Sequence, residues 1–227
     1  MKDSIVGLTL GIRYTRSFRI PDISGEIIDH IIYNDDSPFD SKLFPRIQEN
    51  SNREKILFHP ETNEYLRINT DDIILGIEIN EDFDKKYEWL KNDVLSYFQN
   101  ILFVKFGLKN IKRIGIIFSH KTKKDKKIDE IVKKISANNI SDAENVNISF
   151  SKKSAAQEGI FRKGVKDFQN TIYNFEDMGE SMQVRLDYQY YYEPVVEDLR
   201  QCFIKKVLEG AEQFLVNNFY TWLNEQE

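Results

Sequence analysis

A strand-like segment followed directly by a long amphipathic helix occurs twice in this chain, and this recurrence constrains the fold more than any other feature. In the first copy, apolar residues alternate from Ile73 to Ile79 and then recur at helical spacing from Phe83 to Leu102. In the second copy, alternation from Val184 to Tyr192 precedes a helical stripe from Phe203 to Trp222. A period of two or of 3.6 residues places one side of the element in a core. Each copy therefore needs a second layer that covers its apolar side.

The segments that precede these two copies also correspond to each other. Residues Ile5 to Tyr14 and Lys112 to Ser119 alternate as half-buried strands. Each is followed by a helical pattern, over Asp22 to Tyr33 and over Asp125 to Ala137. Further strands are predicted at Ile56 to His59 and Tyr65 to Asn69 in the first half, and at Asn145 to Ser151 and Thr171 to Phe175 in the second.

Each half is thus expected to run strand, helix, three strands, long helix. We predict an α+β fold with a mainly antiparallel sheet and both long helices packed on one face. The whole chain, residues 1–227, is expected to be a single domain made of two similar halves, 1–110 and 111–227, related by a pseudo-twofold duplication. One continuous core is expected rather than two independent domains, because each half alone carries only one large helix to cover its sheet. Asn34 to Asn52, with two prolines, is expected to be an irregular connection.

Composition indicates where such a chain would reside. The single cysteine, Cys202, excludes an internal disulfide framework and is typical of a reducing compartment. It lies in a helical pattern, where a small buried apolar residue is expected. No stretch approaches the ~20 apolar residues of a membrane span, and the N-terminal residues lack the apolar core of a signal peptide. We expect a cytoplasmic protein with no membrane contact.

Catalytic motifs are not recognisable. The histidines His30, His59 and His120 lie far apart, without metal-ligand spacing, so neither a metal site nor a cofactor is predicted. Acids such as Glu78 and Asp187 match no nuclease pattern, and capping or solvation explains them. His59, beside a proline in a turn, is expected to be exposed. His120 ends a strand next to a lysine-rich turn and is the one weak catalytic candidate; a capping or surface role is its alternative.

Positive charge is unevenly distributed although the net charge is −5. The stretch from Ile111 to Val165 contains 13 Lys and Arg against 6 Asp and Glu. A binding patch for an acidic partner and a solvated, lysine-rich loop both account for this asymmetry. Arginines beside aromatic residues can hold a phosphate and stack on a base. The candidate binding residues are Arg13, Arg16, Arg19, Lys121, Lys123, Lys124, Lys152, Lys153, Arg162 and Lys163.

Several segments together resemble a known family. They are the strand-to-helix passage from Ile74 to Leu90, the strand from Arg113 to Ile117, and the ending from Leu186 to Phe219. They resemble a sporadically distributed family of uncharacterised bacterial and archaeal proteins, whose members also carry a late Leu-Asp strand before a terminal amphipathic helix. The resemblance spans most of the chain, and the lysine-rich turn from Lys121 to Lys127 departs from it. It implies no activity; the patchy distribution implies mobile genes, including host–phage conflict systems.

These observations favour a binding protein over an enzyme. The leading hypothesis is a non-enzymatic binding or assembly subunit of a bacterial defence or other multi-protein system, with a protein partner or a second copy of itself. The alternative is a protein that binds RNA or DNA through the lysine and arginine residues. A third hypothesis is a metal-dependent hydrolase in which the fold brings acids together with His120.

Overall fold

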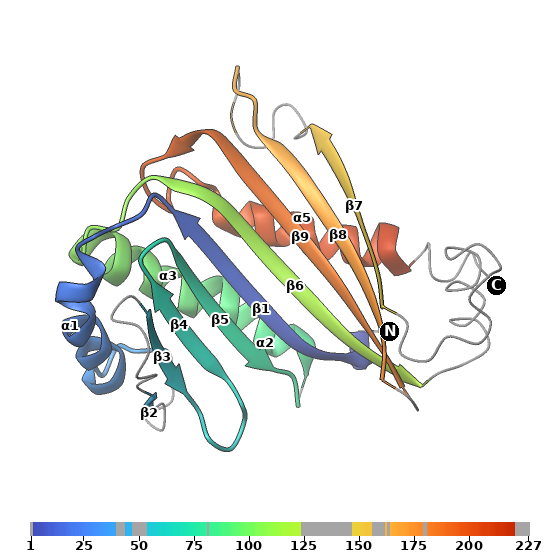
Figure 1. The fold of residues 1–227 in the computed structure, drawn as a ribbon, viewed down its shortest axis with the longest axis horizontal. Coiled ribbons are helices and arrows are strands. Elements are labelled where there is room, and N and C mark those ends of the chain that lie inside the picture. The colour runs from blue at the N-terminus through green and yellow to red at the C-terminus, as the bar shows by residue number, and fades with distance from the viewer. Residues whose placement is uncertain are drawn as a thin grey trace.

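The computed structural model describes residues 2–39, 44–46, 54–80, 82–123, 147–155, 162, 164–178 and 181–220. These residues form an α+β fold with a single large antiparallel sheet (Figure 1), as the alternating segments predict. The strands are β1 (Ile5–Tyr14), β2 (Phe44–Arg46), β3 (Glu54–Phe58), β4 (Tyr65–Asn69), β5 (Asp72–Glu78), β6 (Ile111–Lys123), β7 (Asn147–Ala155), β8 (Phe168–Asp177) and β9 (Ser181–Val196). Their order in the sheet is β2-β3-β4-β5-β1-β6-β9-β8-β7.

Two long helical runs follow β5 and β9. The first is continuous through α2 (Phe83–Trp89), the π-helical η2 (Leu90–Val94), α3 (Leu95–Tyr97) and the π-helical η3 (Phe98–Lys105). The second consists of α5 (Ile204–Phe214) and the π-helical η4 (Leu215–Tyr220). A 3-10 turn, η1 (Lys2–Ser4), precedes β1, and α1 (Ile20–Tyr33) follows it.

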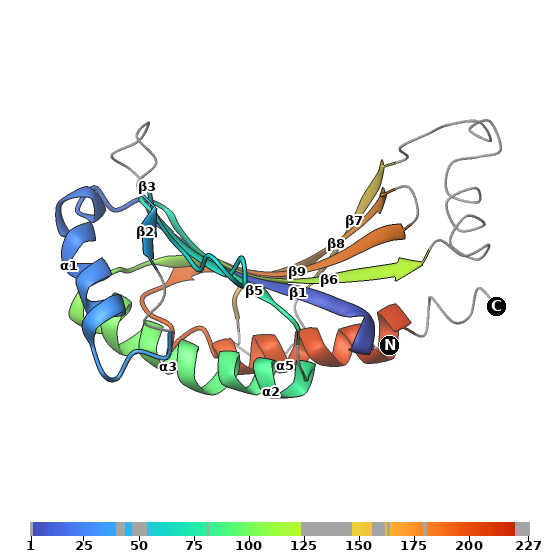
Figure 2. The same cartoon turned by 90° about the horizontal axis from the view of Figure 1, so that it is seen from below.

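The two helical runs lie on the same face of the sheet (Figure 2). The two ends of the sheet, at β2–β3 and at β7, curve away from these helices, so the opposite face is concave. That face, which the described helices leave uncovered, is called the open face below. Alternation assigns each strand residue to a side: Leu8, Leu10 and Ile12 of β1 are buried toward the helices, and the residues between them face the open side.

Capping and stop residues account for some of the helix ends. Asp82 caps α2, because its side chain accepts a hydrogen bond from the backbone N–H of Asp84 at 2.9 Å. Gly107, with φ of +71°, ends the run after η3. The helix α1 begins earlier than Asp22, where its helical pattern was expected to start, and Asp22 is not its N-cap. The helix begins at Ile20, and Arg19 occupies the N-cap position with a helical backbone and no side-chain hydrogen bond.

Three further expectations need correction or lie outside the described residues. The connection from Asn34 to Asn52 contains the short strand β2, which pairs with β3. The terminal helix starts at Ile204, next to the first residue of the expected stripe, and β9 continues past the expected Tyr192 to Val196 before turns lead into it. The helix expected over residues 125–137 lies outside the part of the chain that the structure describes.

Both halves contribute to one cluster of buried residues, which extends from Ile5 to Tyr220. First-half strands occupy one side of the sheet and second-half strands the other, and they meet at the β1–β6 pair. The single domain and the internal duplication remain predictions. Among the described residues, no helix is long and apolar enough to cross a membrane.

Candidate functional site

Two glycines lie at the centre of the open face, and the main chain is partly exposed at one of them, Gly11. Gly11 of β1 and Gly115 of β6 are cross-strand partners, and both lie on the open side. A Cβ atom added at Gly11 would have a single neighbour within 4 Å, the carbonyl oxygen of Gly115 at 4.0 Å. The space above Gly11 is therefore open, and a flat group can approach the main chain there.

A chain of hydrogen bonds runs along the border of this glycine floor. The guanidinium of Arg113 donates to the hydroxyl of Tyr191 at 3.3 Å. That hydroxyl donates to the side-chain oxygen of Gln189 at 2.8 Å, and the Gln189 amide donates to the carboxylate of Asp187 at 2.5 Å. These residues, Arg113, Asp187, Gln189 and Tyr191, are called the open-face network below. Because each member orients the next, the network holds the half-buried Arg113, Asp187 and Tyr191 in fixed positions around Gln189, which is 6% exposed.

Burial sets the electrostatics of Asp187. Desolvation raises the pKa of its carboxyl, and the hydrogen bond from Gln189 and the positive charge of Arg113 partly oppose that effect. The side chain flanks the glycine floor, because a Cβ added at Gly115 would lie 3.6 Å from a carboxylate oxygen of Asp187. Asp187 is thus an acceptor at the edge of the floor that already has one protein donor.

An aromatic pair extends the site across two more strands. Tyr191 of β9 and Phe168 of β8 stack with ring centroids 4.4 Å apart. The ammonium of Lys153, on β7, lies 3.7 Å from the Phe168 centroid, and the Arg113 guanidinium lies 5.6 Å from that of Tyr191. Both cations are thus held against aromatic faces. The strand register places Lys153, Gln189 and Gly115 in one row across the sheet.

The arginines predicted near the first strand reach this end of the open face in part. Arg13 is the cross-strand partner of Arg113, so two arginines are adjacent there. The guanidiniums of Arg13 and Arg16 lie 4.0 and 3.6 Å from the carboxylate of Asp71. Arg19 is exposed beside Gly107, on the turn that leads into α1. Only Arg13 of the three lies in a strand that forms the glycine floor.

The lysine-rich turn lies at the other end of β6. Lys121 is exposed and pairs with Gln183 of β9, on the open side. It stands eight residues from Arg113, or about 27 Å at ~3.4 Å per residue. Lys123 is the last residue of β6, whereas Lys124 lies outside the described residues.

The last group of predicted cations does not converge on one surface. Lys152 precedes Lys153 in β7 and therefore points to the opposite side of the sheet. Arg162 forms an ion pair with the buried carboxylate of Asp167, at 3.0 Å from Nε. Asp167 also accepts from the Tyr190 hydroxyl at 3.2 Å, so this pair anchors β9. Lys163 lies outside the described residues.

The catalytic candidate His120 is buried on the helix side of β6. Its ring packs against Phe219 and Tyr220 at centroid distances of 5.5 and 5.6 Å. Its Nδ1 lies 3.2 Å from the hydroxyl of Ser4, and desolvation lowers its pKa to about 4. The expected surface or capping role is wrong for this residue, which is 2% exposed.

His59 and the acids complete the set of expected residues. His59 is buried rather than exposed. Its Nδ1 accepts hydrogen bonds from the backbone N–H groups of Glu61 and Thr62 at 3.3 Å each, and these bonds shape the β3–β4 turn. Among the described residues, no three His, Cys, Asp or Glu side chains gather in a way that could hold a metal ion.

Sequence reasoning did not single out Arg113 or Gln189 as site residues. A signal was present, because both fall at the uncovered positions of alternating strands. The cross-strand register that brings them together is a property of the assembled sheet. No protein-family model and no curated protein sequence matches this chain.

Proposed function

We propose that this chain is a binding protein whose open face takes single-stranded nucleic acid. The observation that carries the proposal is the open space over Gly11 with the ordered open-face network and cations beside it. The proposal merges the leading expectation, a binding subunit, with the nucleic-acid alternative.

The glycine floor favours an unpaired base as the group that lies on the sheet. Bases in single strands expose their faces and their hydrogen-bonding edges, which a duplex stacks and pairs. A base over Gly11 would have its edge toward Arg113 and Asp187, the half-buried residues that border Gly115. A guanidinium and a carboxylate together offer donors and acceptors to such an edge.

The cations fit the backbone of the same strand. Arg13 and Arg113 stand at one end of the floor, and Lys153 lies across the sheet in the same row as Gly115. Lys121, about 27 Å away along β6, would meet a phosphate several nucleotides further on. Such contacts give affinity that does not depend on sequence and that falls steeply with salt.

The test is fluorescence anisotropy with a labelled 12-nucleotide single strand, as RNA and as DNA, and with the corresponding duplex. We expect binding at 50 mM NaCl and about a 20-fold loss of affinity at 200 mM if three phosphates are contacted. The single strand should bind more tightly than the duplex.

The two adjacent lysines of β7 provide a matched pair of variants. Lys153→Gln removes a charge from the open side, whereas Lys152→Gln removes the same charge from the other side of the sheet. We expect about 5-fold weaker binding for Lys153→Gln and for Arg113→Gln, and little change for Lys152→Gln. Equal losses for the two lysines, or no binding at 50 mM NaCl, would refute the proposal.

A protein partner or a homo-oligomer, the other expectation from the sequence, remains a prediction, as does the cytoplasmic location. The concave surface argued here for nucleic acid has cations and hydrogen-bonding groups at its centre. Protein interfaces are depleted of charge at their centre, and this contrast is why nucleic acid is the preferred occupant.

A further inference from the structure

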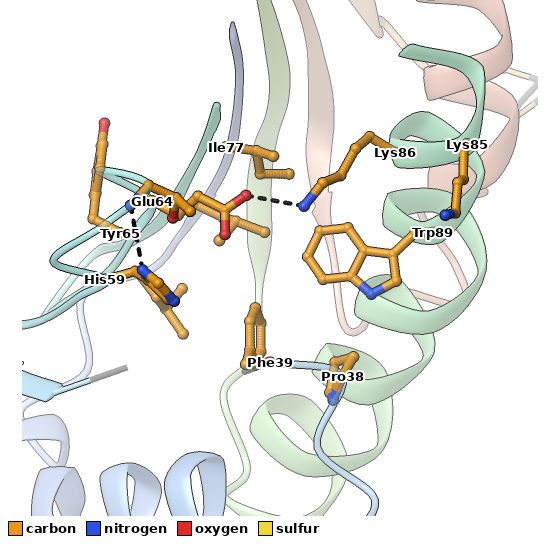
Figure 3. A pocket seen from close by; sticks show the side chains of 12 residues that line it. Pro38, Phe39, His59, Glu64, Tyr65, Ile77, Lys85, Lys86 and Trp89 are labelled. Atoms are coloured by element: carbon orange, nitrogen blue, oxygen red, sulfur yellow. Dashed lines mark hydrogen bonds and ion pairs between the residues drawn. The ribbon is translucent and has the colours of Figure 1, made fainter. Parts of the chain in front are cut away.

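A cavity of about 380 Å³ lies between the β3–β4 turn and α2 (Figure 3), and the charges that span it are already paired. The Lys86 ammonium lies 3.1 Å from the carboxylate of Glu64. The hydroxyl of Thr62, in the same lining, is buried. This cavity therefore offers a ligand mainly apolar walls. The open face differs, because a carboxylate oxygen and several guanidinium donors there are available to a ligand.

The carboxylate oxygen belongs to Asp187. One of its two oxygens accepts the hydrogen bond from the Gln189 amide, and the other has no hydrogen-bond partner among the described residues. That second oxygen would lie 3.6 Å from a Cβ atom added at Gly115. It thus reaches over β6 toward the open space above Gly11, the cross-strand partner of Gly115. A half-buried carboxylate oxygen in this state favours a ligand that donates hydrogen bonds.

Arg113 supplies donors at the same border. It precedes Gly115 by two residues on β6, so both lie on the open side. One of its N–H groups donates to the Tyr191 hydroxyl at 3.3 Å, and no ion pair engages its guanidinium within the described part of the chain. A guanidinium has five N–H donors. Donors therefore remain for a ligand beside the acceptor of Asp187.

Two isoleucines border the space above Gly11. Ile74 of β5 is the cross-strand partner of Gly11, and Ile117 follows Gly115 by two residues on β6. Both side chains are half-buried and lie on the open side. They provide apolar contact for a flat ring, whose polar edge would then point to the two charged groups.

We propose that the base held above Gly11 is guanine. This inference rests on the proposed function and adds the identity of one base. The Watson–Crick edge of guanine presents the acceptor O6, followed by two donors, N1–H and the N2 amino group. A guanidinium beside a carboxylate matches this order, because Arg113 would donate to O6 and Asp187 would accept from N1 and N2.

The other bases match the two charged groups less well. Adenine, cytosine, uracil and thymine each have a single donor group on the Watson–Crick edge, whereas guanine has two. Only guanine can therefore give the carboxylate two hydrogen bonds while its acceptor faces the guanidinium. Hydrogen bonds to an ionised acceptor are stronger than those between neutral groups, so the second bond should be measurable as a preference.

The probes are three labelled 12-nucleotide strands, prepared as RNA and as DNA and compared by fluorescence anisotropy at 50 mM NaCl. One is all uridine or thymidine, one has a single central guanosine, and one has inosine there, which lacks the N2 amino group. We expect the guanosine strand to bind about 5-fold more tightly than either of the others. Equal binding of all three overturns the guanine inference and leaves the single-strand proposal standing, whereas no binding of any strand overturns both.

A pair of acid-to-amide variants locates the preference. Asp187→Asn keeps the shape of the side chain and replaces one acceptor with a donor, so the advantage of guanosine over inosine should fall to about 1-fold. Glu176→Gln is the matched control: it removes a carboxylate from the same side of the sheet, opposite Gln183, and should keep the 5-fold advantage. The ratio between strands cancels any general effect of the lost charge. A folded Asp187→Asn protein that still prefers guanosine rejects the inference; if that variant does not fold, the inosine comparison in the parent protein decides.

Discussion

At the scale of single residues, His120 was the one catalytic candidate from the sequence, and the structure buries it in the core. It is enclosed by Phe219, Tyr220 and Ser4, and its Nε2 has no hydrogen-bond partner among the described residues. Such burial disfavours the charged ring and lowers the pKa to about 4, against an ordinary value of 6.5. The His120 ring in the folded protein is therefore neutral above about pH 4.

This environment predicts how stability depends on pH. Between about pH 6.5 and pH 4 the unfolded chain binds a proton at His120 that the folded protein does not, so the free energy of unfolding falls as the pH falls. The full loss is about 3 kcal/mol from this residue. His120→Leu should remove that contribution, whatever its effect at pH 7. Urea titrations at several pH values measure it; a parallel pH profile for the two proteins would contradict the prediction.

Gly76 is a second residue whose neighbours decide its identity. A Cβ atom there would lie 2.2 Å from the ring of Tyr65, its cross-strand partner, whereas at Gly11 the nearest atom is at 4.0 Å. The Tyr65 ring covers the glycine and occupies the space of a side chain. The two glycines lie on the same side of β5 and β1 and form a matched pair.

We expect Gly76→Ala to destabilise the protein by about 1–3 kcal/mol, because the ring must move or tilt out of its position. Gly11→Ala should change the free energy of unfolding by much less. In a Tyr65→Ala background the cost of Gly76→Ala should largely vanish, and thermal or urea unfolding of the four proteins checks this double-mutant cycle. A full cost that persists without the ring would mean that strand conformation, and not the contact, requires glycine.

At the scale of elements, hydrophobic periodicity predicted which segments pair and which pack. It located β1 from Ile5 to Tyr14 and the start of α2 after Asp82, because both combine a strong pattern with a clear boundary residue. It placed the last strand correctly but ended it early, since β9 runs on to Val196. The end of β6 was missed because its final residues are polar, and their strand conformation depends on pairing with the start of β9.

Periodicity could not resolve the helical detail or the short strand. A 3.6-residue stripe predicts one helix from Phe83 onward, but it does not distinguish the π-helical turns at Leu90–Val94 and Phe98–Lys105. The strand β2 is three residues long and contains Pro45, so it lacks any pattern of its own and exists through its pairing with β3.

The candidate site, too, could be predicted from the sequence only in part. The alternation from Val184 to Tyr192 puts Gln189 and Tyr191 on the side opposite the core tyrosines, and they are hydrogen bonded there. The clustered cations were also visible in the sequence. Their final positions were not, because adjacent lysines 152 and 153 point to opposite sides and Arg162 is engaged by Asp167. Contacts between strands far apart in sequence assemble the site.

At the scale of the whole molecule, the sheet is the structure that joins the two halves. The β1–β6 pair at its centre has one strand from each half, and the residues buried against the helices belong to both. Tyr87 of α2 donates a hydrogen bond to the backbone carbonyl of Leu208 in α5 at 2.8 Å, so the helix layer is also linked. A shared core of this kind predicts one cooperative unfolding transition.

The test of that cooperativity uses a mutation in one half and a probe in the other. The chain has two tryptophans, Trp89 and Trp222, so fluorescence of the Trp222→Phe protein reports on Trp89 in the first half alone. Leu186→Ala, at a fully buried position of β9 in the second half, should cost about 2–5 kcal/mol. In one domain, the urea midpoint of Trp89 fluorescence should fall together with that of far-UV circular dichroism. In two independent domains Trp89 would unfold at its original midpoint, because destabilising the second half would not change the free energy of unfolding of the first.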